Sequence, residues 1–250
     1  MSQTTLIFGG SGKVARHLTK QLSSQGHTVY SIIRKAEQKS DIESLGGKPI
    51  IQSIEDSSVD DMAKTITDTK ASTIVWSAGA GGGSPDRTTA VDRDGAIRSM
   101  DATAKAGVKR YIMVSAVDIR DRENKPEPEW YNDADRAQGA KMWDAIGHYC
   151  RMKLAADKSL VSDNGRRGLE CTIVRPTTLS AEAGTGKVEA GKVHLGRQVS
   201  REDVAAVVVE CMGNERTKGL AFDLVGGEMP IREAVGKVVE QRVDTFEGRY

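Results

Sequence analysis

Tyr149 and Lys153 lie four residues apart, and a tyrosine and a lysine at this spacing could together transfer a proton. They lie in a helical pattern, and residues at this spacing share one face of a helix. A tyrosine with an ordinary pKa of about 10 is a poor proton donor or acceptor at neutral pH, and a nearby ammonium lowers that pKa by stabilising the phenolate. The pair therefore indicates acid–base chemistry. The same spacing also occurs by chance on helix surfaces, so other elements must place the pair beside a cofactor.

A glycine turn near the amino terminus indicates what that cofactor is. Gly9, Gly12 and Ala15 follow the spacing G-x-x-G-x-x-A between an apolar strand pattern and a helical pattern. Glycine permits a tight turn and close approach of a pyrophosphate, and the start of the helix offers free N–H groups to phosphates. A Walker loop fits less well, because Val14 stands where Ser or Thr would follow the lysine. The turn predicts dinucleotide binding, and the alternative is an ordinary glycine-rich connection.

The end of the second predicted strand indicates which dinucleotide is bound. An acidic residue at this place would bind the ribose 2′-hydroxyl of NAD. The strand ends instead with Ile33, Arg34 and Lys35. Because a guanidinium matches the geometry of a phosphate, the sequence favours NADP(H). The alternative is that Arg34 and Lys35 belong to a solvated helix start.

The elements that would position these residues alternate along the chain. Short apolar runs without a polar face alternate with helical patterns, which is typical of a parallel sheet covered by helices on both sides. The fold class is therefore three-layer α/β. Strands are predicted at residues 6–8, 28–33, 49–52, 72–76, 110–114 and 170–174, and helices at 13–25, 36–45, 59–66, 88–106 and 138–162, with a last helix pair from Ser200 on.

Two long segments interrupt this alternation, at residues 120–137 and 177–199. Both follow predicted strands, and the carboxyl ends of the strands form the ligand-binding edge of an open α/β sheet. Long loops at such an edge are commonly functional, so we expect these two segments to form the substrate mouth. The aromatic residues near the first segment would either cover an apolar substrate or anchor the insertion to the core; they are Trp130, Tyr131 and Trp143.

Composition and charge limit the classes of partner. The 250 residues are 38% hydrophobic and carry a formal net charge of +1, which does not favour nucleic acid or an anionic membrane. No apolar run is long enough to span a bilayer, and the first residues do not resemble a signal peptide. The three cysteines, Cys150, Cys171 and Cys211, are widely spaced and predict reduced thiols, with no metal site. We expect a cytoplasmic protein with a small-molecule substrate, as a monomer or a homodimer.

Several motifs in chain order make the sequence resemble an atypical short-chain dehydrogenase/reductase, of the NAD(P)-binding, epimerase-like subgroup. They are GGSGKVA, Arg34, VWSAGAGGG, VDRDG, AGVKRYIMVSA, YCRMK, TIVRPTTL and SREDVA, and they cover nearly the whole chain. The resemblance implies a Rossmann fold with a doubly wound parallel sheet and a small C-terminal substrate-binding region. It also implies one domain over residues 1–250, in which 1–176 form mainly the NADP-binding core and 177–250 mainly the substrate side.

The resemblance further implies roles for individual residues. Tyr149 and Lys153 would form the active site with an upstream hydroxyl, Ser115, and with Asp92 at a position usually occupied by asparagine. Extended relatives carry a second hydroxyl where this sequence has Ala116. The cofactor would be held by Gly9, Ser11, Gly12, Lys13, Val14, Arg34, Ser77, Ala78, Gly79, Lys153, Pro176 and Thr177.

Together these features predict an NADP(H)-dependent oxidoreductase that acts on a carbonyl or an alcohol. Two alternatives stay open. One is a redox-neutral epimerase, isomerase or lyase on the same scaffold. The other is an NADP(H)-binding sensor or regulator without turnover, in which Ala116 and Asp92 mark a decayed site. The fold by itself does not decide among them, because one fold carries many chemistries.

Overall fold

Seven short apolar segments form parallel strands at the centre of the protein. In the computed structural model, which describes residues 2–81 and 84–250, they lie in the order β3-β2-β1-β4-β5-β6-β10. The strand order reverses between β1 and β4, which is the doubly wound arrangement. The seven strands are β1 (Thr4–Phe8), β2 (Thr28–Ile33), β3 (Lys48–Ile51), β4 (Thr73–Trp76), β5 (Arg110–Val114), β6 (Glu170–Pro176) and β10 (Leu220–Gly226).

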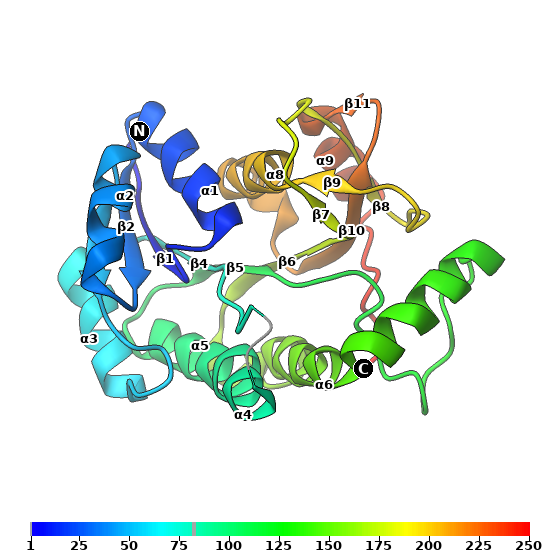
Figure 1. Cartoon of the computed structure of the whole chain (residues 1–250), viewed down its shortest axis with the longest axis horizontal. Helices are drawn as coiled ribbons and strands as arrows, with labels where there is room; N and C mark the ends of the chain where they lie inside the picture. Colours follow the sequence, from blue (N-terminus) through cyan, green and yellow to red (C-terminus); the bar gives the residue numbers. More distant parts are fainter. Residues whose placement is uncertain (1, 82–83) are drawn as a thin grey trace.

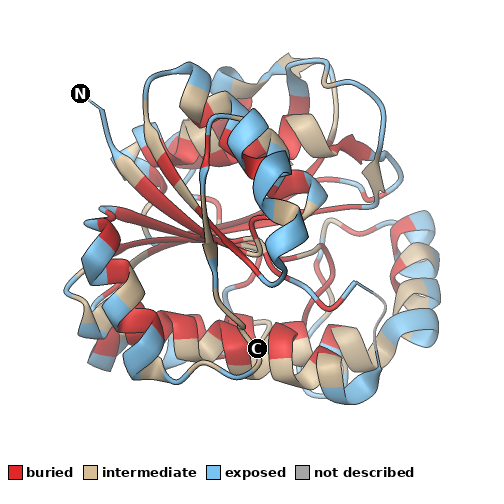
Figure 2. Ribbon diagram, turned by 60° about the vertical axis from the view of Figure 1, so that its left-hand side comes forward, coloured by how far each residue is buried: buried red, intermediate tan, exposed pale blue. Residues whose placement is uncertain are grey.

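Alternate residues of each strand pack against opposite helix layers, because successive side chains of a strand point to opposite faces of the sheet. In β1, Leu6 and Phe8 belong to one buried cluster and Ile7 to the other. Figure 1 shows the two helix layers on either side of the sheet, and Figure 2 shows the buried faces that they turn toward it. One layer contains α1 (Lys13–Ser24), α8 (Arg201–Gly213) and α9 (Ile231–Glu240), and the other contains α3 (Val59–Thr69), α5 (Ala96–Lys105) and α6 (Asp133–Ser162).

The elements predicted between residues 6 and 174 are all present, with small shifts at their ends. The strands at 28–33 and 110–114 match to the residue. The predicted helix at 36–45 is divided into a 3₁₀ turn and a short helix. The two segments are η1 (Ala36–Gln38) and α2 (Lys39–Ser44), and other short helical segments are α7 (Asn164–Arg167) and η3 (Glu215–Thr217).

The predicted helix at 88–106 has an irregular first half. It consists of α4 (Pro85–Thr88), a π-helical stretch η2 (Thr89–Gly95) and then α5. Asp92 lies in the π-helical stretch and is fully buried. Such stretches are rare and are often found at functional sites. The irregularity therefore coincides with a residue that the sequence assigned to the active site.

The predicted helix at 138–162 begins earlier, at Asp133, so the end of the segment 120–137 is helical. The side chain of Asn132 caps it by accepting the N–H of Asp135. Ile146 has non-helical backbone angles (φ −136°, ψ 34°) and divides α6 into residues 133–145 and 147–162. The later part packs beneath the sheet, whereas the earlier part extends away from it (Figure 1).

The last third of the chain differs most from the sequence-based expectation. Residues 177–199 were expected to form an irregular substrate loop, but they contain β7 (Leu179–Ser180), β8 (Lys187–Gly191) and the start of β9 (Val199–Ser200). Strand β8 and β11 (Met229–Pro230) extend the sheet in antiparallel pairing beyond β10, so the sheet is not wholly parallel. These strands escaped prediction because they are short and show little alternation; in β8 only Val188 and Gly191 are buried.

A buried ion pair joins β6 to β10. Arg175 and Asp223 are neighbours in the parallel register, and Arg175 Nε lies 2.8 Å from Asp223 Oδ1. Both side chains are buried, and Thr245 Oγ1 donates a further hydrogen bond to Asp223 Oδ1 at 3.0 Å. The guanidinium also lies over the ring of Phe246, 5.1 Å from its centre. The pair therefore fixes the carboxyl-terminal segment against the sheet.

Arg175→Leu is expected to lower the free energy of unfolding by about 3–5 kcal/mol, because it leaves a buried carboxylate without its partner. The double variant Arg175→Leu/Asp223→Leu removes both charges and should lose less than the two single variants together. Urea unfolding of the parent, both single variants and the double variant measures the coupling free energy. Strictly additive losses would show that the pair is not coupled.

Candidate cofactor-binding and active site

Two glycines shape the turn between β1 and α1 in different ways. Gly9 has φ 80°, and a Cβ there would lie 2.6 Å from the Cα of Ala78. The turn itself therefore requires glycine at this position. Gly12 has φ −65°, which any residue adopts, and a Cβ there would meet the carbonyl oxygens of Gly9 at 3.1 Å and Ser77 at 3.5 Å. At Gly12 the missing side chain thus leaves open a cradle of backbone atoms.

The start of α1 is suited to an anion. The helix begins at Lys13, its N-cap residue Gly12 provides no side-chain cap, and no acidic residue lies in the first turn. The first N–H groups of a helix have no partner within the helix, and the helix dipole favours negative charge at this end. The open cradle and the uncapped helix start together fit the pyrophosphate of a dinucleotide.

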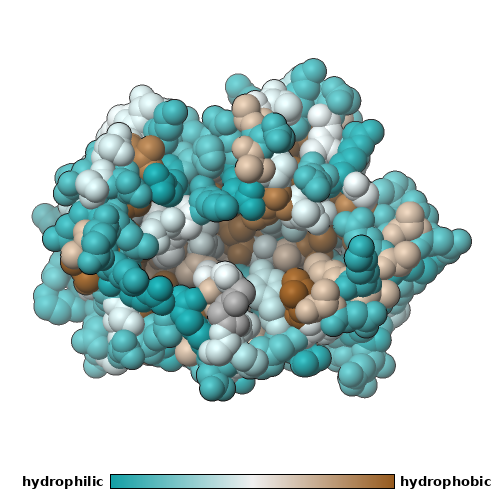
Figure 3. Space-filling model, viewed as in Figure 1, coloured by the Kyte–Doolittle hydropathy of each residue, from teal (hydrophilic) through white to brown (hydrophobic). Residues whose placement is uncertain are grey.

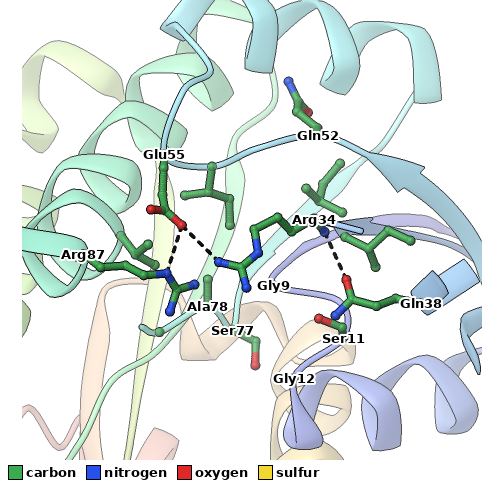
Figure 4. Close-up of a pocket in the computed structure, with 15 residues that line it drawn as sticks. Gly9, Ser11, Gly12, Arg34, Gln38, Gln52, Glu55, Ser77, Ala78 and Arg87 are labelled. Carbon is green, nitrogen blue, oxygen red and sulfur yellow. Dashed lines mark hydrogen bonds and ion pairs between the residues drawn. The ribbon is translucent and has the colours of Figure 1, made fainter. Parts of the chain in front are cut away.

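A cleft of about 200 Å³ lies between this turn and the ends of β2, β3 and β4 (Figure 4). Part of the predicted cofactor-binding set lines it: Gly9, Ser11, Gly12, Arg34, Ser77, Ala78 and Gly79.

The remaining predicted cofactor residues lie outside this lining. Lys13 borders a separate surface depression, and Val14 is buried in the core under α1. Pro176 and Thr177 line an apolar pocket on the other side of the site. The last two glycines of the motif VWSAGAGGG, residues 82 and 83, lie outside the described residues.

Three charged side chains meet in the cleft. Arg34 Nη1 lies 3.4 Å and Arg87 Nε lies 3.0 Å from the same oxygen, Glu55 Oε1 (Figure 4). The turn after β2 is held by Gln38, whose Oε1 accepts the backbone N–H groups of Arg34 and Lys35. Glu55 and Arg87 could not be predicted from the sequence, because one follows β3 and the other lies in α4, and nothing local marks either as part of a site.

Lys153 of α6 is buried, and its side chain is directed toward the end of β5. Lys153 Nζ is 3.6 Å from Asp92 Oδ1, 5.9 Å from the centre of the Tyr149 ring, and donates to the carbonyl of Val114 at 3.4 Å. Asp92 Oδ2 accepts the N–H of Ala80 at 2.9 Å. The structure thus brings Tyr149, Lys153 and Asp92 together. A carboxylate at Asp92 neutralises the buried ammonium, which an asparagine would not do.

The electrostatics of the pair differ from the expectation. Burial raises the pKa of Tyr149, and Lys153 opposes that shift only in part. The expectation that Lys153 lowers the pKa of the tyrosine below its ordinary value is therefore wrong for this structure, because desolvation of the phenolate dominates. Burial disfavours the charged form of Lys153 as well, but Tyr149, Asp92 and Asp157 outweigh it and raise the pKa of Lys153. At neutral pH the pair is a neutral phenol and an ammonium.

Ser115, the predicted upstream hydroxyl, donates its proton to Asp157. The distance from Ser115 Oγ to Asp157 Oδ2 is 2.5 Å, and both residues are buried. Burial raises the pKa of Asp157, against the opposing effects of Arg175, Ser115 and Lys153. Asp157 was not among the predicted site residues, although it lies one further turn along the helix face that carries Tyr149 and Lys153. Ser115 therefore presents lone pairs to the cavity that it lines, while its proton faces inward.

An apolar pocket of about 290 Å³ lies beyond Tyr149. Ser115 and Tyr149 line it, together with Gln138, and most of its exposed surface is apolar. Figure 3 shows hydrophobic side chains on the floor of the central hollow. Tyr149 also borders a wider depression with Gly79, which in turn lines the cofactor cleft. The apolar side chains of the pocket are Ala116, Val117, Met142, Ile146, Pro176, Leu179 and Leu195.

The aromatic residues near the insertion mostly anchor it. Trp130 and Tyr131 pack with Val117 and Leu195 in a small hydrophobic cluster. Val117 and Leu195 line the apolar pocket, but the two aromatic residues do not. Trp143 Nε1 donates to the carbonyl of Asp118 at 3.0 Å, and the side chain borders the wider depression. Of the two alternatives left open by the sequence, the structure favours anchoring for Trp130 and Tyr131.

Two further features concern the described residues, 2–81 and 84–250. No helix among them is long and apolar enough to cross a membrane. They also contain no group of three or more His, Cys, Asp or Glu side chains arranged to hold a metal ion.

Known proteins resemble this chain over nearly its whole length. A family model described as NAD(P)H-binding matches residues 9–215. The UPF0659 protein C216.03 of Schizosaccharomyces pombe is 37% identical over 94% of each chain. The "uncharacterized sugar epimerase YhfK" of Bacillus subtilis is 35% identical over 93% of this chain and 98% of its own. The solved structure of a "putative NAD-dependent epimerase/dehydratase" from Bacillus halodurans is 32% identical, covers 96% of this chain and 100% of its own, and has a TM-score of 0.77.

The mostly parallel sheet, the glycine turn and the cleft beside it define a Rossmann-type nucleotide-binding protein. The chain belongs to the NAD(P)H-binding family, whose model matches most of it. The resemblance to epimerase-like short-chain dehydrogenases/reductases and the predicted fold class are both confirmed.

Gly12→Val is expected to weaken NADPH binding tenfold or more, about 1.4 kcal/mol, because its side chain fills the cradle meant for a phosphate. The fold should persist, since the backbone angles at Gly12 suit any residue. Fluorescence titration measures the affinity, and circular dichroism checks the fold. Gly9→Val is the contrasting variant, and it should lose the native fold because of its positive φ and its contact with Ala78. A folded Gly12→Val protein with parental NADPH affinity would contradict this interpretation of the turn.

Proposed function

We propose that this protein is an NADP(H)-dependent oxidoreductase that interconverts a carbonyl and an alcohol on a small organic molecule. The observation that carries the proposal is the position of Tyr149. It lines both the apolar pocket and the depression that reaches the cofactor cleft, and Lys153 is buried beside it. A proton donor between a cofactor site and an apolar pocket suits carbonyl reduction. When bound, NADP(H) supplies or takes up a hydride.

Different residues would bind different parts of the cofactor. Gly12 and the uncapped start of α1 would hold the pyrophosphate, as their open backbone suggests. Arg34 would bind the 2′-phosphate. Lys153 would bind the nicotinamide ribose, since its ammonium lies beside Tyr149.

Tyr149 would donate its proton to the developing alkoxide oxygen of the substrate, and Lys153 would stabilise the phenolate that remains. Because burial raises the pKa of Tyr149, the phenol is protonated throughout the neutral range. Carbonyl reduction should therefore be insensitive to pH up to that pKa and fall above it, whereas alcohol oxidation should rise with pH. Ser115 would accept a hydrogen bond from a substrate hydroxyl, because its own proton is donated to Asp157.

The substrate that fits best is small and largely apolar, because apolar side chains dominate the pocket beside Tyr149. A second candidate function, redox-neutral epimerisation of a sugar, is favoured by the name of the Bacillus subtilis relative. A mostly apolar pocket would leave many sugar hydroxyls without partners, so we rank it second. Absorbance of cofactor retained on purification, followed by a panel of carbonyl compounds with NADPH, separates the oxidoreductase from the epimerase and from a sensor without turnover.

We also propose a cellular location and a partner for the protein. The three cysteines, Cys150, Cys171 and Cys211, are buried and form no disulfide. Reduced thiols of this kind suit a cytoplasmic protein, and the partner we propose is the small-molecule substrate alone.

Tyr149→Phe keeps the ring and removes the hydroxyl. Turnover of a carbonyl substrate identified by the panel should fall by a factor on the order of 10² or more, the effect of losing a general acid. NADPH affinity should change little. Steady-state kinetics and a cofactor titration measure the two quantities. Parental turnover in this variant would mean that Tyr149 and Lys153 are only a pair on a helix face.

Arg34→Ala is expected to remove most of a preference for NADPH over NADH. We expect that preference to be about tenfold, since Arg34 is half-exposed and must give up its contact with Glu55 to bind a phosphate. Affinity for NADH should stay nearly constant. Calorimetric titration of both cofactors against parent and variant measures the effect. An equal loss for both cofactors would show that Arg34 supports the cleft instead of binding the phosphate.

A further inference from the structure

The cofactor cleft contains more positive than negative charge, because Arg34 and Arg87 both contact the single carboxylate of Glu55. Three segments far apart in the sequence contribute the three side chains: the turn after β2, the loop after β3, and α4. Figure 4 shows both guanidinium groups directed at one carboxylate oxygen. Glu55 is the one acid in the lining of the cleft that the structure describes, so two cations face one anion there. A cleft with this imbalance is suited to a further anion.

The two arginines differ in how firmly they are held. The side chain of Arg34 is 51% exposed, and Glu55 at 3.4 Å is its ion-pair partner among the described residues. The side chain of Arg87 is 31% exposed and lies closer to Glu55, at 3.0 Å. Arg87 Nη1 also donates to the carbonyl of Ala80. The side chain of Arg87 is therefore held more firmly than that of Arg34, which has more freedom to move.

Both guanidinium groups keep N–H donors beyond those that Glu55 uses. Glu55 Oε1 takes one nitrogen from each arginine, whereas a guanidinium offers five N–H groups in a planar fork. A phosphate dianion has more acceptor oxygens and more charge than a carboxylate. A phosphate would therefore accept hydrogen bonds from more of the N–H groups of the two guanidinium groups than Glu55 does.

We propose that Arg87 binds the 2′-phosphate of the cofactor together with Arg34, and that this phosphate takes the place of Glu55 between them. The inference rests on the proposed preference for NADP(H), and it adds a second phosphate-binding cation and a competing carboxylate. Glu55 occupies the phosphate position in the free protein and releases the two guanidinium groups when the phosphate binds. An adenosine 2′-phosphate is the ligand class that this subsite recognises.

Arg87 also connects the subsite to the active site. It holds the carbonyl of Ala80, whose N–H donates to Asp92, and Asp92 faces Lys153. A variant at Arg87 could therefore disturb the loop as well as remove a charge. The test consequently needs a second variant that leaves Arg87 in place and shifts affinity in the opposite direction.

The experiment is calorimetric titration of purified full-length protein with four probes: NADPH, NADH, adenosine 2′,5′-bisphosphate and adenosine 5′-diphosphate. Arg87→Gln should weaken binding of the two 2′-phosphorylated probes about tenfold and leave the other two within about twofold. Glu55→Gln removes the competing charge at nearly constant shape. It should tighten binding of the 2′-phosphorylated probes severalfold without changing the others.

Arg166→Gln is the matched control. Arg166 lies in α7, on the surface, and pairs with Asp101. Helix α7 precedes β6 and therefore lies away from the carboxyl edge of the sheet, so the substitution removes one positive charge far from the cleft. The affinities of this variant should equal those of the parent, which excludes a general effect of net charge. Thermal unfolding of each variant checks that the fold is kept.

Four results would overturn the inference. Equal weakening of all four probes by Arg87→Gln would reduce Arg87 to a support for the loop. Weaker NADPH binding in Glu55→Gln would mean that Glu55 organises the arginines and is not displaced. If Arg34→Ala abolishes NADPH preference while Arg87→Gln retains it, this inference fails and the proposed function stands. A parent protein without any NADPH preference would refute both.

Discussion

The site is organised around one buried ammonium. An ammonium taken out of water costs several kcal/mol unless charges and hydrogen bonds compensate it. Lys153 receives that compensation from the carboxylate of Asp92 and the carbonyl of Val114, with Asp157 close enough to act on its charge. These groups come from η2, β5 and α6, so the requirement ties a π-helical stretch, a strand end and a long helix to one point. Of these segments, η2 borders the cofactor cleft through Val91, and α6 borders the apolar pocket through Tyr149.

The reversal of strand order explains why the cleft lies where it does. Between β1 and β4 the connections leave in opposite directions, and a crevice forms outside the carboxyl ends of the strands. Gly9 allows β1 to turn against Ala78 of the loop after β4, and the N–H of Ala80 in that loop holds Asp92. The backbone that shapes the cofactor cleft is thus also the backbone that holds the partner of Lys153. Nucleotide binding and the active-site charges therefore depend on a single loop.

Two interior features support the proposed reaction, in which the protein donates a proton to the substrate. Burial keeps Tyr149 as a neutral phenol, so its proton is available at neutral pH. Ser115 gives its proton inward to Asp157 and offers lone pairs to the cavity. Beyond them the break of α6 at Ile146 places a half-exposed apolar side chain at the edge of the pocket. The phenol of Tyr149, the hydroxyl of Ser115 and an apolar wall thus line one small pocket.

The sequence by itself determined what depends on local pattern. The alternation of apolar strands and amphipathic helices, the G-x-x-G-x-x-A turn and the spacing of Tyr149 and Lys153 are read along the chain, because each arises from neighbours a few residues apart. The strands β8 and β10 were not predicted. In β8 too few residues are buried to give an alternating pattern, and the strand exists because it pairs with β10 and β11.

Only the tertiary structure decided which charges meet. Glu55 and Arg87 are 32 residues apart along the chain, and Ser115 and Asp157 are 42 apart. No local signal links the members of either pair, because in each pair one residue follows a strand and the other lies on a helix that only the packing of the chain brings beside it. The tertiary structure also decided the sign of the shift in the pKa of Tyr149. The spacing places an ammonium beside the phenol, but burial, which the spacing does not reveal, outweighs that ammonium.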